Sequence, residues 1–222
     1  MELNQYIDHT LLKATATKAD IIQLCTEAKQ HQFFSVCVNS CYISLAKTEL
    51  KNSNVKVCSV IGFPLGAMSI KAKAKETKRA LKDGADEIDM VINLGFLKSK
   101  DFKAVLKDIK AVKKEMPNNV LKVILETCYL TDDEIIKASE LVIKAGANFI
   151  KTSTGFGTGG ATLEHVKLMK DTIANGNTKI KASGGIRDTK TAIKYIEAGV
   201  KRIGTSNGIA IVTRKTTTEN NY

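Results

Sequence analysis

The stretch "DGADEIDMV" at residues 83–91 joins the end of a helical pattern to a buried strand. Gly84 suits the left-handed position that closes a helix, and apolar residues that favour strands follow it. The same turn recurs as "AGANFIKTS" at 145–153 and as "AGVKRIGTS" at 198–206, and a related turn, "NGNTKIKAS", lies at 175–183. Repeated helix-to-strand turns predict successive βα units around a parallel sheet.

Each of these turns places a charged residue or a glycine at one equivalent position of its strand. The residues five positions beyond the turn glycines Gly84, Gly146, Gly176 and Gly199 are, in that order, Asp89, Lys151, Lys181 and Gly204. We expect all four turn glycines to close their helices in the left-handed conformation. Side chains alternate along a strand, so Asp89 shares one face with Glu87 while Ile88 lies on the other.

Eight segments have the length and composition of buried strands, and most are separated by helix-length segments. They are residues 6–10, 33–39, 55–62, 87–93, 120–127, 149–154, 179–183 and 202–206. This series predicts an α/β protein, a (β/α)8 TIM barrel with a single domain over residues 1–222 and a flexible tail at 215–222. A doubly wound open sheet is the alternative. In a barrel, Asp89, Lys151 and Lys181 converge in one cavity at the carboxyl ends of the strands.

The composition excludes several classes of protein. The chain has 222 residues and a net charge of +11, but only four of its 34 basic residues are arginine and aromatic residues make up 5%. We therefore expect no nucleic-acid partner, although a positive field can attract an anionic small substrate. The sequence contains no apolar run long enough for a membrane span and begins without a signal-peptide pattern. Five cysteines without a CxxC pair predict reduced thiols, no metal and a cytoplasmic location.

The inward lysines raise a chemical question. An exposed lysine is neutral in only roughly one molecule in 2,500 at pH 7, and is then a poor nucleophile. Burial and a second cation both favour the neutral amine. With two lysines beside one aspartate, one lysine can act as the nucleophile while the other stays charged and paired with the carboxylate. The residues alone leave open which lysine is which. They also leave open an ion pair that only closes the barrel interior.

Three strand ends are rich in glycine and hydroxyl residues: "KTSTG" at 151–155, "ASGGI" at 182–186 and "GTSNG" at 204–208. Glycine lets the main chain approach a ligand, and oriented N–H groups suit a phosphate. Phosphate sites in barrels recur after strands seven and eight, which is where the last two of these stretches fall. The predicted phosphate-binding residues are Thr154, Gly155, Gly184, Gly185, Gly204, Ser206 and Asn207.

Ordered motifs along nearly the whole chain make the family assignment specific. They are "IDHTLLK" at 7–13, "CVNS" at 37–40, "VIGFPLGA" at 60–67, "EIDMVIN" at 87–93, "LKVILET" at 121–127, "KTSTGFGTGGAT" at 151–162, "KASGGIRD" at 181–188 and "IGTSNGIAIV" at 203–212. The sequence resembles the deoxyribose-phosphate aldolase family in its compact bacterial form. The resemblance implies a class I aldolase that converts 2-deoxy-D-ribose 5-phosphate reversibly to acetaldehyde and D-glyceraldehyde 3-phosphate, in deoxyribonucleoside breakdown.

Residue by residue, the resemblance implies that Lys151 forms the Schiff base and that Lys181 and Asp89 relay protons. It also implies that no metal or other cofactor is needed, and that the chain forms a homodimer or homotetramer. Another phosphate-binding barrel, a transaldolase-like lyase or a sugar-phosphate isomerase, is the alternative. Asn207 stands where the family often has a second serine, so its side-chain contact with the phosphate is an open point.

Several residues near the predicted cavity stay outside the predicted catalytic set. Asp8 and His9 end the first strand and either join the polar network or seal the barrel. Cys37 is expected to be an inert core thiol. Tyr222 could fold back over the site, as tails of this family sometimes do.

Overall fold

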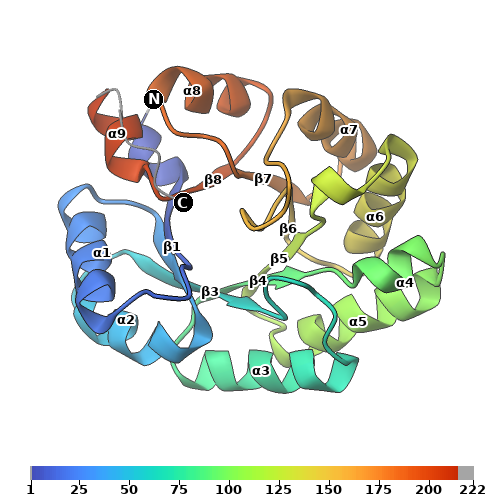
Figure 1. Ribbon diagram of the computed structural model, residues 1–222, viewed down its shortest axis with the longest axis horizontal. Helices are drawn as coiled ribbons and strands as arrows, with labels where there is room; N and C mark the ends of the chain where they lie inside the picture. The colour runs from blue at the N-terminus through green and yellow to red at the C-terminus, as the bar shows by residue number, and fades with distance from the viewer. Residues whose placement is uncertain (1, 215–222) are drawn as a thin grey trace.

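Eight parallel strands close into one barrel inside a ring of helices (Figure 1). This computed structural model describes residues 2–214, so the predicted tail at 215–222, with Tyr222, lies outside the described residues. The strands are β1 (Ile7–Leu11), β2 (Ser35–Val38), β3 (Lys56–Ile61), β4 (Glu87–Val91), β5 (Val120–Ile124), β6 (Phe149–Lys151), β7 (Lys179–Ser183) and β8 (Arg202–Thr205). Each strand pairs with the next, and β8 pairs with β1. The predicted TIM barrel is confirmed, and the open sheet is wrong.

The connections between strands are mainly helical. The helices are α1 (Lys18–Gln30), α2 (Ile43–Glu49), α3 (Ile70–Lys82), α4 (Leu94–Lys98), α5 (Phe102–Glu115), α6 (Asp132–Lys144), α7 (Leu163–Ile173), α8 (Thr189–Glu197) and α9 (Gly208–Thr213), with 3-10 turns at Leu3–Tyr6, Ser40–Tyr42 and Thr127–Tyr129. Within residues 2–214, none of the helices has both the length and the apolar character that crossing a membrane requires.

The helix-closing turns follow the sequence pattern in three of four cases. Gly84, Gly146 and Gly199 all have positive φ angles, of 109°, 77° and 109°. The expectation for Gly176 is wrong. Helix α7 ends at Ile173, and the next residue, Ala174, takes the positive φ of 47° instead. In this connection the left-handed residue therefore lies two positions before the glycine.

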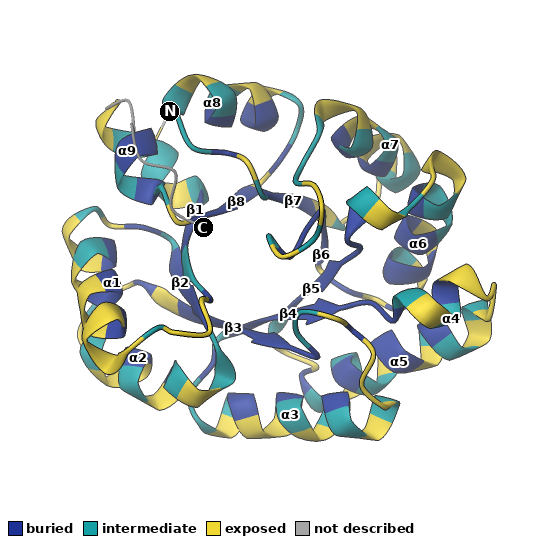
Figure 2. Ribbon diagram, viewed as in Figure 1, coloured by how far each residue is buried: buried dark blue, intermediate teal, exposed yellow. Residues whose placement is uncertain are grey.

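The apolar core lies between the barrel and its helices. Ile88 and Met90 on the outer face of β4 are fully buried in this layer, together with the inward faces of the helices. Figure 2 shows the pattern as buried strands and helices that are buried on one side and exposed on the other. The inner faces of the strands carry Asp89, Lys151 and Lys181, so the barrel interior is polar. This layering confirms the predicted parity of the strands.

Candidate active site

The three predicted catalytic residues meet inside the barrel. Lys151 on β6 and Lys181 on β7 are directly paired in the register of the two strands. Both amines contact the same oxygen of Asp89 on β4, with Nζ–Oδ2 distances of 2.7 Å for Lys151 and 2.8 Å for Lys181. All three side chains are buried. The convergence expected from the repeated turns is therefore present.

A third lysine, which the sequence reasoning missed, contacts the same aspartate. Lys122 on β5 lies opposite Asp89 in the strand register, and its Nζ is 2.9 Å from Asp89 Oδ1. The same amine is 2.6 Å from Glu87 Oε2. The signal was available, because Lys122 interrupts an otherwise apolar strand, as Lys151 does. Its parity on that strand places it inside the barrel.

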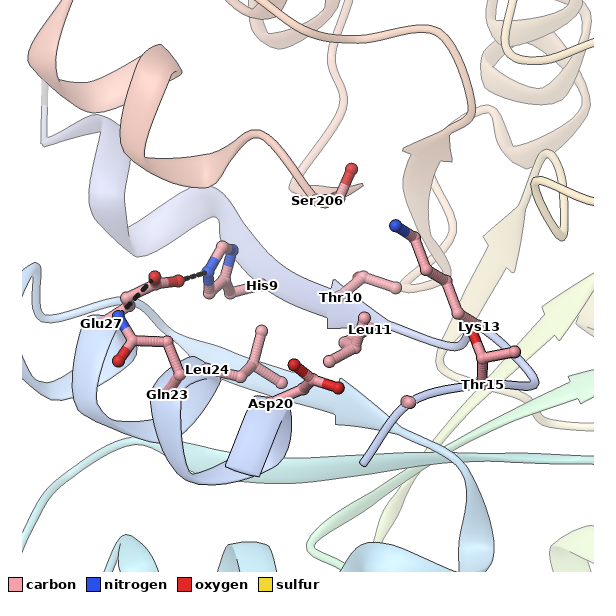
Figure 3. A pocket seen from close by; sticks show the side chains of 11 residues that line it. His9, Thr10, Leu11, Lys13, Thr15, Asp20, Gln23, Leu24, Glu27 and Ser206 are labelled. Atoms are coloured by element: carbon pink, nitrogen blue, oxygen red, sulfur yellow. Dashed lines mark hydrogen bonds and ion pairs between the residues drawn. The ribbon is translucent and has the colours of Figure 1, made fainter. Parts of the chain in front are cut away.

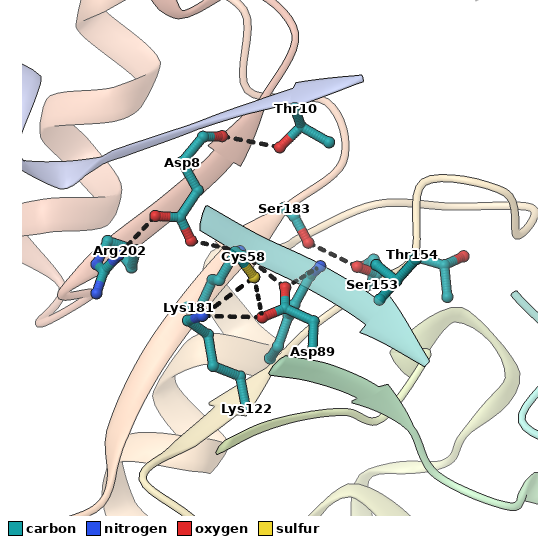
Figure 4. A network of polar contacts seen from close by, with 12 residues as sticks. Asp8, Thr10, Cys58, Asp89, Lys122, Ser153, Thr154, Lys181, Ser183 and Arg202 are labelled. Carbon is teal, nitrogen blue, oxygen red and sulfur yellow. Dashed lines mark hydrogen bonds and ion pairs between the residues drawn. The ribbon is translucent and has the colours of Figure 1, made fainter. Parts of the chain in front are cut away.

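Further acidic and basic side chains continue this network toward the amino-terminal ends of the strands, and Figure 4 shows the contacts of Asp8 among them. Asp8 on β1 lies between two cations, with its oxygens 2.5 Å from Lys181 Nζ and 2.6 Å from Arg202 Nη1. Arg202 also contacts Glu87 at 3.1 Å. Asp8 thus joins the polar network, whereas His9 points out of the barrel and binds Glu27 on α1 at 2.8 Å.

The charges of this lumen network do not balance. It contains three carboxylates and four basic groups: Asp8, Glu87 and Asp89 against Lys122, Lys151, Lys181 and Arg202. Three of the basic groups contact two carboxylates each. Among the described residues Lys151 contacts only one, Asp89, and shares it with two other lysines. Of the four basic groups, Lys151 is therefore the one that the fewest carboxylates hold.

The network keeps Asp89 and Lys181 charged. Burial alone would raise the pKa of Asp89, but the ammonium groups of Lys122, Lys151 and Lys181 outweigh burial and hold that pKa well below its usual range. Burial alone would lower the pKa of Lys181, but the carboxylates of Asp8 and Asp89 raise it well above its usual value. A charged lysine therefore stays paired with an ionised aspartate beside Lys151.

A cavity of about 310 Å³ opens over the network at the carboxyl ends of the strands. The predicted site residues that line it are Lys151, Thr154, Gly155, Gly184, Gly204 and Ser206. Gly185 is exposed and Asn207 is half-buried, and neither is among the residues that line this cavity. The Asn207 side chain instead accepts a hydrogen bond from Ser206 Oγ at 3.3 Å. Figure 1 shows the loop after β6 projecting toward the centre of the barrel.

The loop after β6 is held from one side by a carboxylate. Glu126, two residues beyond the end of β5, is buried and has a left-handed φ of 56°. Its carboxylate accepts hydrogen bonds from the backbone N–H of Thr154, at 3.1 Å, and from the Thr154 hydroxyl. Strained residues of this kind persist where the surroundings over-determine them, often near functional sites. Sequence reasoning missed Glu126, because only the fold brings it to Thr154.

Two glycines have packing roles that the sequence did not specify. A Cβ at Gly204 would lie 3.0 Å from Lys181 Cε, so glycine at this position leaves room for the lysine side chain. A Cβ at Gly160 would lie 2.4 Å from the Gly184 carbonyl oxygen. The loops after β6 and β7 therefore touch through their main chains, which fixes one side of the cavity.

Two thiols lie beside the aspartate. Cys37 and Cys58 face each other on β2 and β3, and their sulfurs and an Asp89 oxygen all lie within 4.8 Å of one another. Among residues 2–214 this is the group whose spacing suits a metal ion. The Cys58 thiol, however, donates to Asp89 at 3.1 Å, and burial raises its pKa well above the usual value. Lys122 Nζ lies 3.5 Å from the same sulfur. A protonated thiol beside an ammonium group is a poor metal ligand.

Comparisons with known proteins agree over almost the whole chain. The model of the family described as DeoC/LacD family aldolase matches residues 3–214. A deoxyribose-phosphate aldolase of Finegoldia magna is 62% identical over 212 residues, which cover 96% of this chain and 99% of that protein. One of Brevibacillus brevis is 54% identical over 222 residues, all of both chains. A solved deoxyribose phosphate aldolase from Aeropyrum pernix, described as a unique tetrameric structure, has a TM-score of 0.88 and 33% identity, covering 95% of this chain and 89% of that one.

Proposed function

The chain belongs to the DeoC/LacD family of aldolases, and from this premise we propose that it is a class I aldolase acting on 2-deoxy-D-ribose 5-phosphate. It cleaves this sugar phosphate reversibly to acetaldehyde and D-glyceraldehyde 3-phosphate, the activity named for its relatives. The observation that carries the mechanism is the position of Lys151. Of the four bases in the lumen network, it is the one that lines the cavity, and it has a single carboxylate partner.

The first step is attack by the Lys151 amine on the C1 aldehyde of the open-chain sugar. A new C–N bond forms, water leaves, and the product is a protonated imine, the iminium. The positive charge of the iminium then lies beside the Asp89 carboxylate, whose Oδ2 is 2.7 Å from Lys151 Nζ. The iminium is an electron sink, and for this reason we propose that the reaction needs no metal or organic cofactor.

The second step breaks the C2–C3 bond. The C3 hydroxyl loses its proton, the C3–O bond becomes a carbonyl, and the electron pair of the C2–C3 bond moves to C2 and the iminium to form an enamine. Asp89, through water, accepts the hydroxyl proton, and Lys181 beside it holds a proton that can be passed on. C2 of the enamine is then protonated, and hydrolysis of the imine releases acetaldehyde and restores Lys151. An ionised Asp89 and a charged Lys181 suit both transfers.

The 5-phosphate binds at the glycine-rich end of the cavity in this proposal. Thr154, Gly155, Gly184, Gly204 and Ser206 line the cavity and offer backbone and hydroxyl donors. A direct phosphate contact from Gly185 or Asn207 stays a prediction.

The remaining proposals concern the setting of the enzyme. Assembly as a homodimer or homotetramer is supported by the tetramer described for the Aeropyrum pernix relative. A cytoplasmic location and the lack of a nucleic-acid or membrane partner stay predictions.

Reductive trapping tests the covalent step. Wild type, Lys151→Ala and the surface variant Lys167→Ala are incubated with acetaldehyde and sodium borohydride in the presence of EDTA, and the labelled lysine is located by mass spectrometry. We expect wild type and Lys167→Ala to carry an ethyl group on Lys151 and to lose activity. Lys151→Ala should be unlabelled in the lumen and at least about a thousandfold less active. A label only at Lys181 contradicts the assignment, and no label at all favours an isomerase that needs no covalent amine.

A further inference from the structure

The charges around the active-site cavity are one-sided. Within the described residues, its lining contains two basic side chains, Lys13 and Lys151, and no carboxylate. The substrate proposed above carries an aldehyde at one end and a phosphate of about −1.5 to −2 charges at the other. Lys151 reacts with the aldehyde, so Lys13 is the basic lining residue that remains for the phosphate.

That cation stands between two cavities. Lys13, in the loop after β1, lines the active-site cavity and also a second cavity of about 370 Å³ beside α1 (Figure 3). The second cavity has carboxylates, Asp20 and Glu27. In Figure 3 the Lys13 side chain extends away from Asp20 and toward the loop that carries Ser206. Ser206 lines both cavities as well.

The carboxylates of the second cavity are already engaged. Asp20 Oδ2 accepts hydrogen bonds from the backbone N–H and the hydroxyl of Thr17, each at 2.7 Å, as part of the capping box of α1. Glu27 accepts from His9 at 2.8 Å and from Gln23 at 2.9 Å. Among residues 2–214, no carboxylate lies within ion-pair distance of the Lys13 ammonium. The charge of Lys13 contributes to the lowered pKa of Asp20 after the two Thr17 hydrogen bonds, but within the described residues the Lys13 side chain stands at the cavity wall without an ion pair.

We propose that Lys13 binds the phosphate of the substrate and determines the preference for phosphorylated over unphosphorylated sugars. This inference rests on the proposed function. The glycine-rich turns supply oriented dipoles on one side, at Gly184 and Gly204, and Lys13 supplies the full charge from the loop after β1. Because Lys13 is exposed, its charge costs little desolvation free energy when the site is empty, and it can form an ion pair with the phosphate dianion when the site is filled.

Substrate discrimination tests the proposal. The ratio of kcat/KM for 2-deoxy-D-ribose 5-phosphate to that for 2-deoxy-D-ribose is measured for wild type, Lys13→Gln, Lys13→Arg and Lys18→Gln. Lys18 is exposed at the start of α1 and lines neither cavity, so Lys18→Gln removes the same charge from the same region. We expect the ratio to fall at least about tenfold in Lys13→Gln, the lower end for a charge-assisted hydrogen bond. Lys13→Arg should retain most of it, and Lys18→Gln all of it.

An unchanged ratio in Lys13→Gln, or an equal fall in Lys18→Gln, overturns the inference and leaves the aldolase proposal intact. A wild type that cleaves neither sugar refutes the proposed function instead. A second measurement needs no variant and covers the case in which Lys13→Gln does not fold. Lysine acetylation of wild type is followed by mass spectrometry with and without sn-glycerol 3-phosphate, an unreactive phosphate ester. Protection of Lys13 but not of Lys18 supports the proposal, and equal reactivity with and without the ester overturns it.

Discussion

The protein buries charge in two places, and the two are built differently. Outside the barrel, Lys73 on α3 and Asp108 on α5 form a pair at 2.5 Å, with side chains no more than 1% exposed. Lys73 also donates to the Val91 carbonyl at 2.9 Å, which ties both helices to the end of β4. Inside the barrel, three carboxylates and four bases form the lumen network. The outer pair has one basic side chain and one carboxylate, whereas the lumen network has one more basic side chain than carboxylates.

The pKa values of the two regions shift in opposite directions. Burial raises the pKa of Asp108 and lowers that of Lys73, because one partner each does not make up for lost water. In the lumen the pKa of Asp89 is lowered and that of Lys122 is raised, because several opposite charges outweigh burial. The number of partners, more than burial itself, decides whether an internal group stays charged. Lys151 contacts a single carboxylate, and it is the lumen lysine that faces the cavity.

The largest expected difference between the two regions is in kcat, when the aspartate of each region is replaced by asparagine. Asp89→Asn leaves three lysines without their shared partner, and we expect kcat to fall about 100- to 10,000-fold. Its free energy of unfolding should fall by about 3–5 kcal/mol, as expected when a buried pair loses one partner. Asp108→Asn should lose comparable stability but retain a kcat close to that of wild type. Steady-state kinetics and urea unfolding check both variants. A comparable loss of activity in Asp108→Asn would contradict the view that the lumen network serves catalysis and the outer pair serves stability.

A smaller effect is expected from removing a lysine that does not line the cavity. Lys122→Met removes a charged contact to Asp89 while keeping the length of the side chain. We expect kcat to fall about 10- to 100-fold, the kinetic equivalent of a charged hydrogen bond, with KM little changed. Lys73→Met is the matched control in the outer pair and should change stability without changing kcat. A larger change in KM than in kcat for Lys122→Met indicates a role in binding instead of positioning.

The smallest effect is expected in the acid limb of the stability curve. The folded pKa values of Asp8 and Asp89 lie below the ordinary 3.8, so their ionised forms stabilise the fold; this stability is present above about pH 4 and is lost as pH falls through the folded values. The pKa of Asp108 is raised, so its protonation favours the folded state. Thermal unfolding between pH 2 and pH 7, roughly the range that spans these groups, should show a shallower acid limb in Asp89→Asn and an equal or steeper one in Asp108→Asn. Parallel curves for all three proteins contradict these directions.

Local pattern was enough to find part of the site. The repeated turns at Gly84, Gly146 and Gly199 set the parity of their strands, and parity on β4 and β6 placed Asp89 and Lys151 inside the barrel before any contact was known. Lys122 was missed because its strand does not follow one of the repeated glycine turns. Arg202 has the parity of Gly204, so the same pattern could have found it. Glu126 could not have been found in this way, because its partner Thr154 lies 28 residues away in the chain and only the fold brings the two together.

The sequence by itself determined the alternation of helices and strands, the inward face of the strands that follow the repeated turns and the family of the chain, because these depend on residue periodicity and on motifs of a few residues. The tertiary structure decided which charges share a partner. Strand register and barrel closure place four bases around three carboxylates, and they leave Lys151 at the cavity with one carboxylate. Electrostatic energies depend on distances between groups that are remote in the chain, so this distinction between two inward lysines exists only in the folded protein.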